Sequence, residues 1–122
     1  MAKTYKILLF MKRRKGMDVT EFRDYYETHH VPLVTKGGAG LSHYVRRYIE
    51  PLPHPETGDW QEPPFDVITE IGTQDEAAFH ALVTAMTTSV MPKNIREDEE
   101  KLFDRSSFRI ATVVEQGTGS TS

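Results

Sequence analysis

One stretch of the sequence combines side chains that can move protons with side chains that can line an apolar site. Phe22, Tyr26 and His30 recur at four-residue spacing, so a helix would carry all three on one stripe. An imidazole titrates near neutral pH, and His30 can therefore take a proton from a phenol, an enol or a carbon acid and return it. We interpret His30 as a candidate catalytic base, Tyr26 as a candidate catalytic hydroxyl that orients the imidazole or the ligand, and Phe22 as a substrate contact.

These residues also have purely structural interpretations. A histidine in the last turn of a helix can bond a free carbonyl and interact with the helix dipole, and tyrosines on an amphipathic stripe usually serve as packing residues. His29 points about 100° away from His30 on a helix, so the two imidazoles cannot readily share one small ligand. The spacing therefore predicts no metal site.

A second group of polar residues falls on two predicted strands. Asp66 belongs to a strand over residues 65–71, while His43 and Arg47 share one face of a strand over residues 41–49. We predict a cluster in which Asp66 is catalytic, placing or polarising a substrate that His43 and Arg47 contact; the alternative is an ordinary ion pair. Trp60, in a proline-rich turn, is predicted to cover a pocket or dimer seam, or simply to pin down the loop.

Apolar periodicity predicts the elements that position these side chains. Asp18 and either Thr73 or Asp75 can cap two longer helices, Pro92 can begin a short charged one, and Pro32 is predicted to end the first. Glycine-rich residues 36–40 are predicted to be a loop. Strands are predicted at residues 5–11, 41–49, 65–71 and 108–115.

This order of elements predicts an α+β fold, the ferredoxin-like split βαβ with an antiparallel four-stranded sheet. Helices would cover one sheet face, and the bulk on the other favours a homodimer in which a second copy lays its sheet against the first. We expect one domain over residues 1–116 and a disordered C-terminal tail over residues 117–122.

Composition narrows the class of protein. The 122 residues contain no cysteine, which excludes disulfides, thiolate metal sites and cysteine nucleophiles. A net charge of -3 argues against nucleic acid as the main partner. The sequence has no apolar stretch of membrane-spanning length. We therefore expect a cytoplasmic protein with neither nucleic-acid nor membrane partners.

Several segments together resemble the EthD family of dimeric α+β barrels. They are residues 6–17 and 21–26, the sequence His30-Val31-Pro32-Leu33, the strand at 65–70 and the acidic segment at 98–104. The resemblance implies a homodimeric barrel whose relatives include cofactor-independent enzymes of aromatic and polyketide metabolism and a protein associated with ethyl tert-butyl ether degradation. Relatives are often filed under oxidoreductases, and some fungal ones are assigned as decarboxylases or dehydratases.

These observations lead to a functional hypothesis with two alternatives. We expect a small enzyme that binds a hydrophobic aromatic or polyketide-like molecule between helices and sheet and performs acid/base chemistry without a cofactor. Decarboxylation, dehydration, lyase cleavage and cofactor-free oxygenation all fit, because one fold hosts many activities. The alternatives are a non-catalytic accessory or ligand-binding protein of an oxidative degradation pathway, and a haem-binding relative of the same barrel architecture.

Overall fold

One antiparallel sheet of four strands organises the chain in the computed structural model, which describes residues 5–36, 41–88 and 92–119. The strand order is β2-β3-β1-β4, which confirms the predicted ferredoxin-like sheet. Of the loop predicted at residues 36–40, Lys36 is instead helical, because the first helix extends further than predicted. Residues 37–40 and the last three residues of the predicted tail, 120–122, lie outside the described residues. The strands are β1 (Tyr5–Met11), β2 (His43–Tyr48), β3 (Val67–Thr73) and β4 (Arg109–Thr112).

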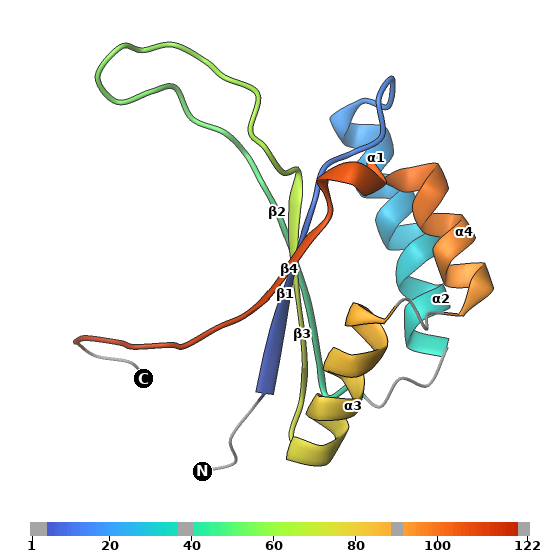
Figure 1. Ribbon diagram of the computed structural model, residues 1–122. Helices are drawn as coiled ribbons and strands as arrows, with labels where there is room; N and C mark the ends of the chain where they lie inside the picture. The colour runs from blue at the N-terminus through green and yellow to red at the C-terminus, as the bar shows by residue number, and fades with distance from the viewer. Residues whose placement is uncertain (1–4, 37–40, 89–91, 120–122) are drawn as a thin grey trace.

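Strand register separates an apolar face from a mixed one. On β1, Ile7, Leu9 and Met11 are buried; Ile7 lies opposite Ile71 and Met11 opposite Val67 on β3. Because successive side chains of a strand point to opposite faces, the residues between them on β1 point the other way. All the helices lie on one side of the sheet, as Figure 1 shows with the sheet seen edge-on. The other face is open.

The first helical segment is longer than the sequence predicts. It consists of α1 (Val19–Tyr25), a π-helical turn η1 (Tyr26–His30) and α2 (Val31–Lys36). Asp18 caps it as predicted, accepting a hydrogen bond of 2.8 Å from the Glu21 amide. The prediction that Pro32 ends the helix is wrong. Pro32 falls in the first turn of α2, after the wider π-helical turn has interrupted the α-helical hydrogen bonds, and a proline is tolerated in a first turn.

Two further helices cover the rest of the same face. The helix α3 (Glu76–Thr87) begins at Asp75, whose carboxylate accepts hydrogen bonds from the Ala77 and Ala78 amides, so that predicted cap is confirmed. The charged helix α4 (Lys93–Leu102) follows Pro92 as predicted, and a short 3-10 turn η2 (Arg105–Ser107) connects it to β4. In the described part of the chain, every helix is too short or too polar to span a membrane.

The connection between β2 and β3 projects away from the sheet. It runs through residues 49–66 and has no regular secondary structure, as its prolines predict. A turn at its tip is closed by hydrogen bonds between the backbones of His54 and Asp59 and of Gly58 and His54. This loop, green in Figure 1, and the segment after β4, red, both lie on the open side of the sheet.

Candidate functional site

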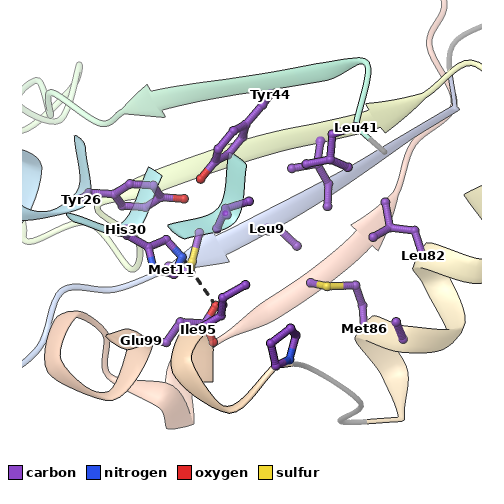
Figure 2. Close-up of a pocket in the computed structure, with 14 residues that line it drawn as sticks. Leu9, Met11, Tyr26, His30, Leu41, Tyr44, Leu82, Met86, Ile95 and Glu99 are labelled. Carbon is purple, nitrogen blue, oxygen red and sulfur yellow. Dashed lines mark ion pairs between the residues drawn. The ribbon is translucent and has the colours of Figure 1, made fainter. Parts of the chain in front are cut away.

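A cavity of about 160 Å³ lies between the sheet and the helices. Its walls are mainly aliphatic: Leu9 and Ile71 contribute from the sheet, Leu82 and Met86 from α3, and Ile95 from α4. Figure 2 shows the side chains of Leu9, Leu82, Met86 and Ile95 around one space, with polar side chains, among them His30 and Glu99, at one end. Cavities of this kind, apolar with a few convergent polar groups, are the usual form of small-molecule sites. The polar lining residues are Tyr26, His30, Tyr44 and Glu99.

The π-helical turn positions His30 at the polar end of the cavity. The amide of Val31 donates to the carbonyl of Tyr26, a five-residue step that marks the widened turn. The rings of Tyr26 and His30 meet edge to face with centroids 5.2 Å apart, and a second edge contact comes from Phe103 at 5.8 Å. Only 3% of the His30 surface is exposed, so its orientation is fixed by packing rather than by solvent.

Asp98, on α4, binds the His30 imidazole through Nδ1. The distance from its Oδ2 to Nδ1 of His30 is 3.1 Å, and its Oδ1 accepts a 2.5 Å hydrogen bond from the Tyr25 hydroxyl. A carboxylate that accepts from both neighbours requires the His30 proton to sit on Nδ1, which leaves the Nε2 lone pair free. Burial lowers the pKa of His30, and Asp98 partly opposes that shift. The neutral imidazole is therefore the favoured form.

Glu99 approaches the other ring nitrogen of His30. Its Oε2 lies 3.8 Å from Nε2, the pair joined by the dashed line in Figure 2, and its Oε1 receives the Arg105 guanidinium. Burial raises the Glu99 pKa to about 7, with Arg105 opposing the shift and Asp98 adding to it. The side chain is 4% exposed, whereas that of Arg105 is 41% exposed, so water weakens the opposing effect of the guanidinium.

Two tyrosine hydroxyls complete the polar end. The Tyr26 hydroxyl shares a hydrogen bond of 2.6 Å with Oγ1 of Thr69, and burial raises the pKa of Tyr26 well above its ordinary value. Burial likewise raises the pKa of Tyr44 to about 12. Figure 2 shows the Tyr44 hydroxyl directed toward that of Tyr26. Both phenols stay protonated at neutral pH, and they can donate hydrogen bonds to an oxygen atom of a ligand.

Of the residues singled out from the sequence, His30 and Tyr26 line the cavity. Phe22 is buried one layer behind them, with its ring centroid 6.1 Å from that of Tyr26. It supports the Tyr26 ring rather than lining the cavity. Trp60 lies on the projecting loop and is 66% exposed.

The predicted strand cluster divides into two separate groups. Asp66 is buried and binds the segment after β1: its carboxylate accepts from the Arg13 amide at 2.9 Å and pairs with the Arg13 guanidinium at 2.6 Å. His43 and Arg47 lie on the open face of the sheet, where both pair with Glu70. The structure therefore does not bring Asp66, His43 and Arg47 together, and none of them lines the cavity.

Sequence reasoning missed the acidic partners of His30. Asp98 and Glu99 are separated from His30 by 68 and 69 positions, and nothing local in the sequence links them. A signal was present for Glu99: it falls on the same helical stripe as Ile95 and Leu102, both buried. A carboxylate on the inner stripe of a helix is costly unless it is paired or protonated, so its position marks a candidate functional group.

The residues at the polar end do not form a metal centre. Across residues 5–36, 41–88 and 92–119, no three histidine, aspartate or glutamate side chains are arranged to hold a metal ion. The chemistry that this arrangement can perform with its own side chains is proton transfer, because a histidine with an aspartate behind it and a free Nε2 is a form of general base.

Fold and cavity together define a ferredoxin-like α+β protein with a mainly apolar cavity between sheet and helices. An EthD domain matches residues 14–106, and the chain belongs to the EthD domain family. No curated protein sequence matches the chain.

Solved structures share the fold. A protein of the ethyl tert-butyl ether degradation (EthD) family from Bacillus halodurans is 21% identical, with a TM-score of 0.59 over 93% of this chain and 100% of that one. An EthD-like protein from Ralstonia eutropha is 18% identical, with a TM-score of 0.55 over 97% of this chain and 98% of that one. At these identities the likeness establishes the architecture, not the chemistry.

Proposed function

We propose that the protein binds a small, mainly apolar molecule in the cavity and moves protons on it with its own side chains. His30 acts as general base and then as general acid, and the hydroxyls of Tyr26 and Tyr44 orient a ligand oxygen. The observation that carries this proposal is the placement of His30, which lines the cavity while its Nδ1 lies 3.1 Å from the Asp98 carboxylate and its Nε2 makes no hydrogen bond to a described residue. A positioned base in a dry site abstracts protons that water would leave in place.

Cavity size limits the ligand class. At about 160 Å³, the cavity compares with engineered protein cavities of roughly 150 Å³ that bind benzene. A single aromatic ring with a small polar substituent fits such a space, and a larger polyketide-like molecule requires the walls to move. Decarboxylation, dehydration, lyase cleavage and cofactor-free oxygenation of such ligands all begin or end with a proton transfer, so each remains within the proposal.

The proposed assembly is a homodimer formed through the open face of the sheet. Leu8 and Phe10 point to that face, opposite the buried residues of β1. The two segments that project on the same side (Figure 1) carry large exposed apolar side chains; these are Leu52, Trp60, Val113 and Val114. Together with Leu8 and Phe10 they offer apolar contacts beside the Glu70 ion cluster on this face, and a second copy can cover them. A cytoplasmic location is part of the same proposal.

Exchange of carbon-bound protons with solvent tests the proposed chemistry. Acetophenone is a single-ring ketone with exchangeable methyl protons, and their replacement by deuterium in heavy water is followed by proton NMR. We expect the wild-type protein to accelerate this exchange above the buffer rate, and His30→Gln to lose roughly 100-fold of that acceleration. His43→Gln is the matched control, since His43 lies on the open face away from the cavity.

The same measurement separates catalysis from ligand binding alone. Saturation-transfer NMR reports whether acetophenone binds the wild type. Binding without any acceleration of exchange would favour the accessory, non-catalytic class, whereas neither binding nor exchange would count against both. Equal loss in His30→Gln and His43→Gln would contradict the role given to His30.

A further inference from the structure

Two polar atoms at the end of the cavity make no direct hydrogen bond to any described residue. Nε2 of His30 and Oε2 of Glu99 lie 3.8 Å apart, which is too far for a direct hydrogen bond. Within the described residues, the hydrogen bonds of these two side chains are made by their other atoms, Nδ1 with Asp98 and Oε1 with Arg105. Both side chains line a mainly apolar space, so these two atoms are available to a ligand.

Of these two atoms, Nε2 of His30 can accept a hydrogen bond and Oε2 of Glu99 can donate one. Asp98 places the His30 proton on Nδ1, so Nε2 offers a lone pair. Glu99 is 3% exposed, and this burial raises its pKa and favours its protonated form, a carboxylic acid that can donate from Oε2. Such a neighbouring acceptor and donor match a ligand that carries a removable proton beside an acceptor oxygen.

Among the residues that the structure describes, four other titratable or charged groups lie near Glu99. Arg105 of η2 binds its outer oxygen, and Asp98 precedes it on α4 and faces Nδ1 of His30. Tyr26 from η1 and Tyr44 from β2 line the same end of the cavity as neutral phenols. Arg105 favours the ionised carboxylate, while Asp98 disfavours it.

We propose that Glu99 is a second catalytic residue, a general acid that works with His30 on an uncharged carbonyl compound bearing an acidic C–H bond beside the carbonyl. In the forward step, His30 Nε2 takes the proton from carbon as the C–H bond breaks. The carbon–carbon double bond forms, and the carbonyl oxygen takes the proton from Glu99 as its π bond opens. The products are a neutral enol, an imidazolium and a carboxylate.

The reverse step restores every group. The imidazolium returns a proton to carbon, the enol hydroxyl returns its proton to Glu99, and no oxidant or cofactor is consumed. The transient imidazolium and carboxylate lie side by side, so each stabilises the charge of the other in a site with poor screening. This inference rests on the proposed function, and it names Glu99 and the carbonyl class as additions to it.

The test uses acetophenone exchange in heavy water with Glu99→Gln. Glutamine keeps a hydrogen-bond donor at this position but cannot give up a proton. We therefore expect the acetophenone dissociation constant to change less than about threefold, while the exchange rate falls roughly 10- to 100-fold. Glu97→Gln is the matched control, because Glu97 lies on the same helix with a side chain that is 57% exposed. It is expected to keep the wild-type rate.

The pH dependence of the exchange rate distinguishes a catalytic role of Glu99 from a purely structural one. Exchange requires Glu99 to be protonated, so the wild-type rate is expected to fall as the pH rises through about 7. Glu99→Gln should lose this alkaline decline. A second measurement needs no variant: the carbonyl carbon of carbon-13-labelled acetophenone should move downfield on binding the wild type, since it accepts a hydrogen bond.

The outcomes separate the two proposals. If His30→Gln is inactive but Glu99→Gln keeps both the wild-type rate and the alkaline decline, the role of Glu99 is overturned and the proposed function stands. An unshifted carbonyl carbon in bound acetophenone would also overturn it. If the wild type does not exceed the buffer rate, the proposed function itself fails.

Discussion

On the helix-covered side of the sheet Glu99 lies beside His30, and on the open side Glu70 lies beside His43. Both carboxylates are largely buried, at 3% and 6% exposure. Burial alone would raise the pKa of Glu70, but His43, Lys6 and Arg47 together lower it. Glu99 has one half-exposed cation and an acidic neighbour, so its pKa rises. A glutamate beside a histidine is therefore part of a cluster of ion pairs on the open side, whereas on the helix-covered side the glutamate has a raised pKa.

The two carboxylates differ in whether each keeps an oxygen atom that makes no hydrogen bond to a described residue. Glu70 is surrounded by cations, with Arg47 at 3.3 Å and Lys6 at 3.7 Å, and these contacts fix its charge. Glu99 and His30 each keep an atom without a hydrogen bond among the described residues, facing a cavity. Unsatisfied polar atoms in a dry space, rather than the presence of a histidine and an acid, carry the potential for chemistry.

Of the variants that test this comparison, Asp98→Asn is expected to have the largest effect on the exchange rate. The amide keeps the size of the side chain, but it no longer enforces the tautomer that leaves Nε2 free. We expect the acetophenone exchange rate to fall roughly 1,000-fold, by analogy with the orienting aspartate of serine proteases. Circular dichroism checks that the fold is kept, and Glu70→Gln on the open face is the control. A loss of less than tenfold would show that Asp98 does not orient His30.

The pH dependence of stability distinguishes the two carboxylates by sign. Between 4.5 and about 7 the folded protein keeps a proton on Glu99 that the unfolded chain has released. The contribution of Glu99 to the free energy of unfolding therefore decreases with rising pH across this window, by roughly 3.4 kcal/mol at most. Glu99→Gln should remove the decrease, as measured by urea unfolding between pH 4.5 and 8.

Glu70→Gln should act at the other end of the pH scale. The pKa of Glu70 is lowered in the folded protein, so its stabilising effect is present above pH 4.5 and is lost as the pH falls through the folded pKa. His30, whose folded pKa is lowered, adds a decrease in stability on acidification below pH 6.5. It is present in both variants, so the difference between each variant and the wild type isolates the carboxylate. Slopes of the same sign would contradict the contrast.

The smallest expected effect concerns the open face as a binding surface. Phe10→Asp places a charge among the apolar residues of that face, so we expect dimerisation to weaken roughly tenfold or more. Sedimentation equilibrium measures the dissociation constant. Val19→Asp, at an apolar position that is 42% exposed on the first helix, is the control and should leave it unchanged. A wild type that stays monomeric at every concentration would rule out the proposed assembly.

Local patterns in the sequence determined the elements and part of the site. A nearly continuous apolar run at residues 5–11 predicted a strand with bulk on both faces, and four-residue spacing placed Tyr26 and His30 on one helical stripe. Asp18 and Asp75, as predicted N-cap residues, indicated where two helices begin. These features depend on neighbours a few positions apart, and the backbone periods of strand and helix are enough to predict them.

Only the tertiary structure determined which acidic side chains contact which basic ones. Asp66 was expected beside His43 but binds Arg13, and His30 receives Asp98 and Glu99 from a helix 68 and 69 positions away. The contacts of His30 depend on how α4 packs against the π-helical turn, and no local periodicity of the sequence encodes that packing. Whether a buried carboxylate is neutralised or left to hold a proton follows from the cations that packing brings near it, which is a property of the folded chain.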